Sequence, residues 1–578
     1  MSRLPAVSNP GSFEFPMNQI IKQFMEDFNE SEELTFPEPS ENFEAFSNFS
    51  IVSKEYKNDF DIDDVSMGET QGIDGLAIIA NGNLVTSTEE VDDLVEKNNY
   101  LEASFVFIQA KTRRSFEGAD ISNFFASIND FLSDSPQFTQ TAEIQRAIQF
   151  KDKIWEHVSK MKKGKPICRI YYVTTGQWQE DKSLKVRVEN HVSDLRKMSL
   201  FEGIEFIPCG ASEIQDLYLQ TKRGTECEFI FEKHVVLPAV KSVQEAYSGV
   251  VKFDEFLKII TDDGGLKDVF YENVRDFLGE SNSVNEEIEA TLKGADLELF
   301  SLLNNGITMV ANTKTNKGNV FYIENYQIVN GCQTSHVLFN NKDREGMNNI
   351  YVPLKLIITD DDNIQNKVIV ATNNQTSIPK EQLEAFSKFQ KELELFYDSE
   401  TSVPAKLFYE RRQRQYRDKK VSRPRIVTIR EQIKVFAAMF LDQPHTASGY
   451  FSKVYTSNKE KMFIEGDKYD PYYISAFGMY KLLSLISIGA IDKKYRMARY
   501  HILMIFRMQF EKNIPKANSR AMEKYCARIK EVLLRDDETD RRFKDAIAVL
   551  ESVKSINLEE PETLYTGENT ELLKEVLS

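Results

Sequence analysis

Over the first 240 residues, short apolar runs alternate with segments whose apolar residues recur at helical spacing. Apolar runs of this length bounded by turn signals predict buried strands. The predicted strands are IDGLAII (73–79), a short one at 84–85, SFVFIQAK (104–111), KPICRIYYVTT (165–175) and IEFIPCG (204–210). The helical spacing predicts helices over 41–57, 89–96, 122–132 and 141–161. Alternating strands and helices predict an α/β domain whose sheet is covered on both faces.

The pattern changes near residue 240 and again near residue 426. The middle part has strand patterns in NNGITMVAN, FYIENYQIVNG and YVPLKLIIT, with helices expected to begin near Ser335 and Pro379. After residue 426 almost every apolar residue follows helical spacing. We therefore predict four regions: a helix and linker over 1–40, the α/β domain over 41–240, an α+β domain over 241–425 and a mostly helical region over 426–578.

Length and composition restrict the class of protein. A chain of 578 residues is too long for one hydrophobic core, and 41% hydrophobic with 28% charged residues is a globular composition, not a disordered or fibrous one. Five cysteines and six histidines lie scattered without metal-ligand spacing, which argues against a dedicated zinc site. We find no membrane-length apolar run and no secretion signal, so we expect a cytoplasmic protein with no membrane partner.

Polar side chains stand where two of the predicted strands begin or end. Asp74 lies at the start of one apolar strand. Gln109 and Lys111 lie at the end of another, and because side chains alternate along a strand, both point to the same face. If the strands pair, the Asp74 carboxylate converges with the Gln109 amide and the Lys111 ammonium. The oxygen atoms suit Mg²⁺ or Mn²⁺, and Lys111 can stabilise charge developing on a phosphodiester. The alternative is that Gln109 and Lys111 simply end a strand at the surface.

Gly-Ile-Asp-Gly followed by an apolar strand that ends in Gln-x-Lys resembles the Mrr-like variant of the restriction-endonuclease-like fold, where Gln replaces the Glu of the Asp, Glu-x-Lys signature. The resemblance implies a metal-dependent endonuclease domain over 41–240, with Asp74 and Gln109 as metal ligands and Lys111 as a catalytic residue. It also implies a helical Glu before the Asp strand, for which Glu44 is the first choice and Glu55 the alternative. The long interval from Asp74 to Gln109 implies an insertion, and a Gln ligand implies weaker metal affinity than a Glu.

Three amide-rich clusters follow apolar segments in the middle of the chain, at 304–306, 330–334 and 372–375. Amides and hydroxyls can bind a base edge or a phosphate without adding charge. Asn-Gly is also an ordinary turn signal, which explains one such cluster easily. The candidates for contact with a ligand or target are Asn305, Asn330, Gln333, Thr334 and Asn374.

Residues 406–430 hold ten Lys or Arg against two acidic residues, a net charge of +8 in a chain of net charge −18. Arginine binds phosphate and aromatic rings stack on bases. The candidates for nucleic-acid contact are Tyr409, Arg411, Arg412, Arg414 and Arg417. The alternative is a surface hinge in which Glu410 neutralises Arg414 at helical spacing.

The amide clusters together with LFYERRQRQY (407–416) resemble the AIPR family, the abortive infection phage resistance proteins of bacteria. The two resemblances imply an antiphage effector that cleaves nucleic acid, with DNA as the expected substrate, a phage-derived trigger and a homodimeric state. One rival is a catalytically inert nucleic-acid-binding or regulatory sensor protein of a defence system. Another is a nucleotide-binding switch, which has less support because no Walker-type phosphate loop is present.

Overall fold

The computed structural model places most of the chain. The described residues are 18–577 without 57, 69–71, 163, 180, 223–224, 263–264, 268, 271–290, 293–296, 362–363, 366, 369–370, 372–379, 412–414, 417–418, 450, 512 and 559, and without the side chains of 333, 380–387, 452 and 561. The chain divides into two units: the first contains residues 1–30, 35–86 and 101–221, and the second contains residues 31–34, 87–100 and 222–578. The first unit ends at residue 221, compared with the boundary at 240 that the sequence pattern predicts, and the segments predicted as α+β and helical regions both lie in the second unit.

The first unit is built on a five-stranded mixed sheet of order β2-β1-β3-β4-β5. Its strands are β1 (Gly75–Ala80), β2 (Asn83–Leu84), β3 (Ala103–Lys111), β4 (Ile167–Thr174) and β5 (Gly203–Cys209). β1 runs antiparallel to β3, whereas β3, β4 and β5 are parallel to one another. The uninterrupted apolar run at the centre of β3 is buried throughout, as expected of a strand covered on both faces.

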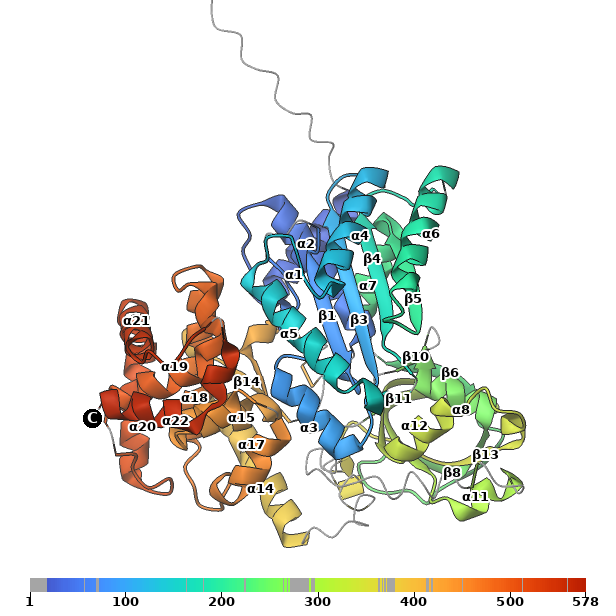
Figure 1. Ribbon diagram of the computed structural model, residues 1–578. Helices are drawn as coiled ribbons and strands as arrows, with labels where there is room; N and C mark the ends of the chain where they lie inside the picture. The colour runs from blue at the N-terminus through green and yellow to red at the C-terminus, as the bar shows by residue number, and fades with distance from the viewer. Residues whose placement is uncertain are drawn as a thin grey trace, which may run out of the picture. The chain divides into compact units, whose positions relative to one another are not determined.

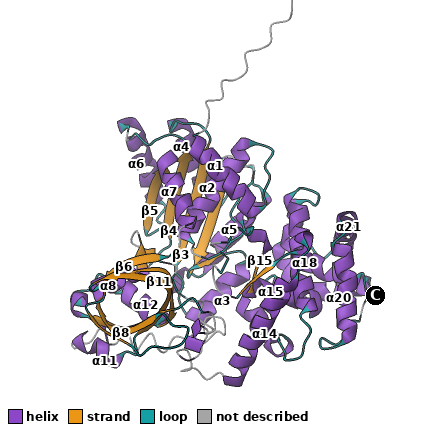
Figure 2. Cartoon of the chain, turned by 180° about the vertical axis from the view of Figure 1, so that it is seen from behind, coloured by secondary structure: helices purple, strands orange, loops and turns teal. Residues whose placement is uncertain are grey.

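Helices cover both faces of this sheet, as Figures 1 and 2 show from opposite sides. One face carries α4 (Gly118–Leu132), α5 (Ala142–Glu156) and α6 (Lys182–Lys197), and the other carries α1 (Gln19–Glu32), α2 (Pro39–Glu55) and α7 (Ala211–Lys222). Side-chain caps start several helices where the sequence supplies them: the Thr141 hydroxyl accepts from the Ile144 N–H at 3.2 Å at the start of α5. The predicted α/β architecture of this unit is therefore present.

The acidic helix that interrupts the Asp74 to Gln109 interval is α3 (Thr88–Asn98). Its residues cluster with the second unit, not with the sheet strands on either side of it in the chain. The predicted insertion is therefore a segment that leaves the first unit after β2 and returns at β3.

The second unit contains a six-stranded sheet of order β6-β12-β11-β13-β8-β7. Its strands are β6 (Glu226–Ile230), β7 (Lys233–Val236), β8 (Glu245–Lys252), β11 (Ile307–Lys317), β12 (Val320–Asn330) and β13 (Tyr351–Ile358). β6 and β7 are joined by residues 231 and 232 alone, yet they form opposite edges. So short a link requires a rolled sheet, and the rings of Tyr247 and Phe321, three strands apart, have centroids 5.0 Å from each other. Figure 2 shows the curl.

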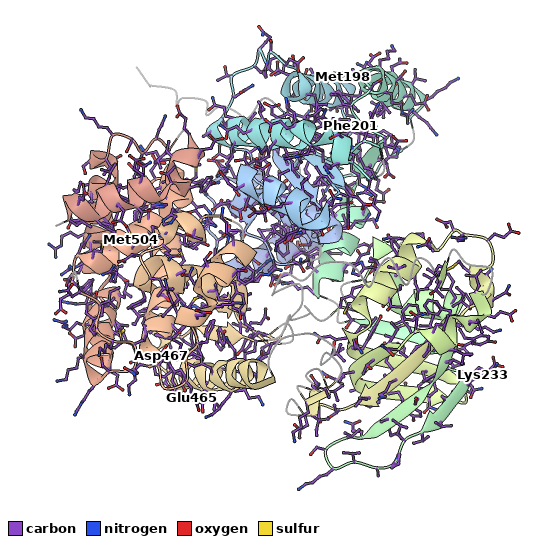
Figure 3. All side chains as sticks on the ribbon, turned by 60° about the horizontal axis from the view of Figure 1, so that its bottom comes forward. Met198, Phe201, Lys233, Glu465, Asp467 and Met504 are labelled. Carbon is purple, nitrogen blue, oxygen red and sulfur yellow. The ribbon has the colours of Figure 1, made fainter. Side chains whose placement is uncertain are left out.

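Shorter elements accompany this sheet: helices α8 (Phe253–Ile260), α11 (Phe300–Leu303) and α12 (Cys332–Asn340), and the strand pair β9 (Thr261–Asp262) and β10 (Gly265–Leu266). Among its described residues, the rest of the unit is mainly helical and also contains the two-stranded sheet of β14 (Phe408–Glu410) and β15 (Ile426–Thr428). Its helices are α14 (Lys380–Ser399), α15 (Ile429–Phe440), α16 (Pro444–Ala447), α17 (Phe451–Asn458), α18 (Asp470–Ser487), α19 (Arg499–Met508), α20 (Arg520–Leu533), α21 (Asp536–Ser552) and α22 (Gly567–Val576). Met504 of α19, labelled in Figure 3, lies fully buried in their common core. The helical C-terminal region is therefore confirmed.

His501 on α19 makes the stability of the helical core depend on pH. The ring is fully buried, and burial together with the neighbouring His445 lowers the pKa of His501 from 6.5 to about 3. Below pH 6.5 the unfolded chain binds a proton that the folded chain does not, so stability falls as the pH decreases. Between pH 7 and pH 5 this group costs about 2 kcal/mol of unfolding free energy.

We expect His501→Leu to remove that loss. Urea denaturation followed by far-UV circular dichroism at pH 7 and pH 5 measures the change in unfolding free energy between the two pH values. If the parent and the variant lose equal stability between the two pH values, His501 is not the group responsible.

Candidate functional site

Asp74 lies immediately before β1 and continues its pairing with β3. Its backbone N–H donates to the Ile108 carbonyl at 2.9 Å, and its Oδ2 accepts from the Ala110 N–H at 2.8 Å. The carboxylate thus occupies the place where the next backbone acceptor of the ladder would lie. Asp74 is only 8% exposed, and these two hydrogen bonds fix its position at this end of the two strands.

Lys111, the last residue of β3, pairs with this carboxylate. Its Nζ lies 3.3 Å from Asp74 Oδ2, and its side chain is 27% exposed against 7% for Asp74. Burial raises the pKa of Asp74, while Lys111 and the Ala110 N–H oppose that rise. The ion pair therefore has a desolvated acid inside and a cation that solvent or a ligand can reach.

Glu44 on α2 is the second acid of the site. Burial and then the charge of Asp74 raise the pKa of Glu44 to about 7, and Lys111 opposes them. Asn48, one helical turn further along α2, donates from Nδ2 to the Asp74 carbonyl at 2.9 Å. Glu44 and Asn48 therefore present the same side of α2 to the Asp74 segment. The sequence prediction missed Asn48, although its spacing of four from Glu44 was a usable signal.

Glu55, the alternative acid, lies elsewhere. Its carboxylate accepts from Arg169 Nη1 at 2.8 Å and from the Tyr171 hydroxyl, both on β4. Between the two candidates, the structure places Glu44 beside Asp74 and ties Glu55 to β4.

Gln109 faces α4 from the middle of the sheet. Its side chain is 3% exposed, and its Oε1 has no hydrogen-bond partner among the described residues. A Cβ added to Gly72 would lie 3.4 Å from Gln109 Nε2 and 2.9 Å from Ser127 Oγ. The described contacts join Asp74, Lys111 and Glu44 to one another but do not join Gln109 to them.

The carboxyl oxygens of Asp74 and Glu44 and the amide oxygen of Gln109 are of the kind that a divalent cation such as Mg²⁺ prefers. Asp74 and Glu44 are carboxyls whose pKa values are raised by burial, and for Glu44 also by the charge of Asp74. Gln109 Oε1 is a buried acceptor without a donor among the described residues. No group of three or more His, Cys, Asp or Glu suited to a metal occurs in the described part of the chain. A cation here would rely on two carboxylates and one amide, with water completing its coordination.

Gly75 is required for the packing of α2 on this site. A Cβ at Gly75 would lie 2.5 Å from Asn48 Cγ and 2.8 Å from Asn48 Nδ2, and Asn48 is itself buried. Gly75→Ala should therefore displace α2 and cost about 1–3 kcal/mol, the usual range for overpacking. Thermal melting measures this, with Gly203→Ala at the start of β5 as the control, because Gly203 has nothing within 4 Å of an added Cβ and no positive φ. Equal melting temperatures for parent and Gly75→Ala would contradict the predicted clash.

Two of the amide clusters meet in the second unit, beside the β11–β12 pair. Gly306 and Gly331 have φ values of +79° and +89°, and a Cβ on Gly331 would lie 3.0 Å from the Gly306 carbonyl oxygen. Asn305 is exposed, Asn330 is half-buried at the end of β12, and Thr334 is half-buried in the first turn of α12. The backbone thus explains the glycines of both clusters. The Gln333 side chain and Asn374 lie outside the described residues.

The predicted nucleic-acid contacts of Tyr409 and Arg411 need correction. Tyr409 is fully buried and its hydroxyl donates to Gln390, while the Arg411 side chain is 9% exposed and paired with Glu394. Neither side chain is available to a base or a phosphate at the surface. The two partners lie on α14, 19 and 17 residues earlier in the chain, and no local pattern in the sequence indicates these contacts. Arg412, Arg414 and Arg417 lie outside the described residues.

Other cations of the basic stretch have acidic neighbours from outside residues 406–430, which lowers the local charge. The pairs are Lys406 with Asp398 at 3.9 Å, Arg423 with Glu32 at 3.9 Å and Arg425 with Glu33 at 2.6 Å. The net charge counted along 406–430 therefore overestimates the positive charge of this surface.

The geometry defines an α/β unit with an acid–lysine site, joined to a unit with a rolled sheet and a helical core. A family model described as AIPR protein matches residues 270–560, which lie in the second unit. The chain belongs to the AIPR family.

No curated protein and no solved structure matches the chain. No helix of the described residues is long and apolar enough to cross a membrane. Family membership supports a role in antiphage defence.

Proposed function

We propose that this AIPR protein is an antiphage effector whose first unit is a metal-dependent nuclease of the restriction-endonuclease-like class, with DNA as its substrate. The observation that carries the proposal is the Asp74–Lys111 pair at the end of adjacent strands, with Glu44 beside it. A structural ion pair would not require a third, desolvated acid next to it, because the added negative charge is unfavourable.

Each residue has a chemical role in this proposal. Asp74, Glu44 and Gln109 would hold the metal, which neutralises phosphate charge and activates water when bound. Lys111 is partly exposed, so its ammonium can donate to a phosphate oxygen and stabilise the negative charge that develops there. The Ala110 N–H and Asn48 keep the Asp74 segment in place, so the acid need not be ordered when substrate arrives.

The direct test uses the purified full chain with supercoiled plasmid, linear DNA and single-stranded RNA in MgCl₂, and with EDTA as the control. Nicking or linearisation of DNA that requires the metal is the expected result. Cleavage of RNA alone would change the substrate class, and the absence of cleavage of every substrate would refute the proposal. The phage-derived trigger and the homodimer stay predictions.

A second candidate function is a regulatory protein with an inert nuclease-like unit. It is favoured by one observation: Lys111 already occupies Asp74 Oδ2, and the site has only two carboxylates. Metal binding without cleavage in the same assays would support this candidate.

A further inference from the structure

Gln109 has a neighbour on β4 that the sequence did not bring into the site. β3 and β4 are parallel, and Gln109 is paired in register with Tyr172. Paired residues of adjacent strands project to the same face of a sheet. The ring of Tyr172 lies 6.4 Å from that of Phe124 on α4, and the Gln109 amide lies against the same helix. Both side chains are therefore held between β3, β4 and α4.

Their polar ends share an unusual condition. Gln109 Oε1 and the Tyr172 hydroxyl are both buried, and neither has a hydrogen-bond partner among the described residues. Leaving a buried polar group unpaired costs about 1–3 kcal/mol. Two such groups at paired positions of β3 and β4 therefore indicate that they act together. The preceding residue shows the contrast, because the Tyr171 hydroxyl donates to Glu55 on the opposite face of the sheet.

The two groups are chemically complementary. The phenol of Tyr172 carries a proton and is a hydrogen-bond donor. It can donate that proton to an oxygen. The carbonyl oxygen of Gln109 has two lone pairs, so it can accept from Tyr172 and still present an acceptor to a cation.

We infer that Tyr172 is a positioning residue for Gln109, an inference that rests on the proposed metal site. Its hydroxyl donates to Gln109 Oε1, directly after a small rotation or through one water. This contact decides which end of the amide faces the cation. An amide needs such a device because its NH₂ end would repel the metal, whereas the two oxygens of a carboxylate are equivalent. Tyr172 thus orients the Gln109 amide, an orientation that a Glu at position 109 would not need.

The test is a double-mutant cycle read by calorimetric titration of the full chain with Mn²⁺. Tyr172→Phe should weaken Mn²⁺ binding by about 10–100-fold, the usual effect of losing a group that orients a metal ligand. The same change made in Gln109→Glu should leave Mn²⁺ binding unchanged within about twofold, because Glu needs no orientation. Tyr171→Phe is the matched control and should bind Mn²⁺ like the parent.

Each outcome has one meaning. If Tyr172→Phe binds Mn²⁺ like the parent, or weakens binding equally in both backgrounds, Tyr172 does not orient Gln109 and the inference fails while the metal site stands. If the parent itself binds no Mn²⁺, the proposed function fails and takes the inference with it. Circular dichroism and melting temperatures of all five proteins establish that each is folded.

Discussion

Asp74→Asn is expected to reduce Mg²⁺-dependent DNA cleavage by at least about 100-fold. The amide has the size of the carboxylate and can still accept from the Ala110 N–H, so the end of the β1–β3 ladder should persist. It lacks the negative charge that pairs with Lys111 and that would bind a cation. Lys111→Met should have an effect of similar size, because it removes the only cation paired with Asp74 in the described contacts.

The measurement is the initial rate of plasmid nicking in excess MgCl₂, accompanied by melting temperatures and by plaque counts of cells that express each variant. Asp194→Asn and Lys197→Met provide matched controls, because this pair is exposed on the surface of α6 in the same unit. Loss of cleavage and of phage protection should occur together in the Asp74 and Lys111 variants alone. Should both variants cut DNA at the parent's rate, the site assignment is wrong.

Arg411→Gln is expected to destabilise the second unit by about 3 kcal/mol, the lower end of the range for breaking a buried ion pair. The loss is moderated because Glu394 also accepts from Gln415. Since the Arg411 side chain is only 9% exposed and is paired with Glu394, the slope of log DNA affinity against log salt should not change. A residue in contact with phosphate would instead alter that slope by about 0.9.

Denaturant unfolding and DNA binding at several salt concentrations measure the two quantities. Lys420→Gln is the control, since Lys420 is exposed in the same stretch, and its stability should change by less than about 0.5 kcal/mol. An Arg411→Gln protein of unchanged stability and reduced salt slope would restore the nucleic-acid role that the sequence predicted for this residue.

Family membership and the nuclease proposal rest on different parts of the chain. The AIPR match covers residues 270–560, whereas Glu44, Asp74, Gln109 and Lys111 all precede it. The two conclusions can therefore be tested separately. Loss of phage protection in an Asp74 variant would connect them, because it would show that the defence role depends on the acid–lysine site.

The sequence by itself determined most of the elements. An apolar run such as FVFI in β3 predicts a buried strand, and local periodicity and turn residues predict where the strand ends. It also determined that Asp74 and Lys111 would meet if their strands paired, because alternation along a strand leaves little freedom. The apolar faces of the C-terminal helices were visible for the same reason.

Only the tertiary structure decided which distant groups meet. The choice of Glu44 over Glu55 depends on how α2 lies against the sheet, and the position of Tyr172 beside Gln109 depends on the register of β3 and β4. Tyr409 is buried, the Arg411 side chain is 9% exposed, and α14 supplies their partners Gln390 and Glu394. Local sequence carries the energies of a helix or a strand, but burial and pairing are properties of contacts between segments far apart in the chain, so no local pattern could report them.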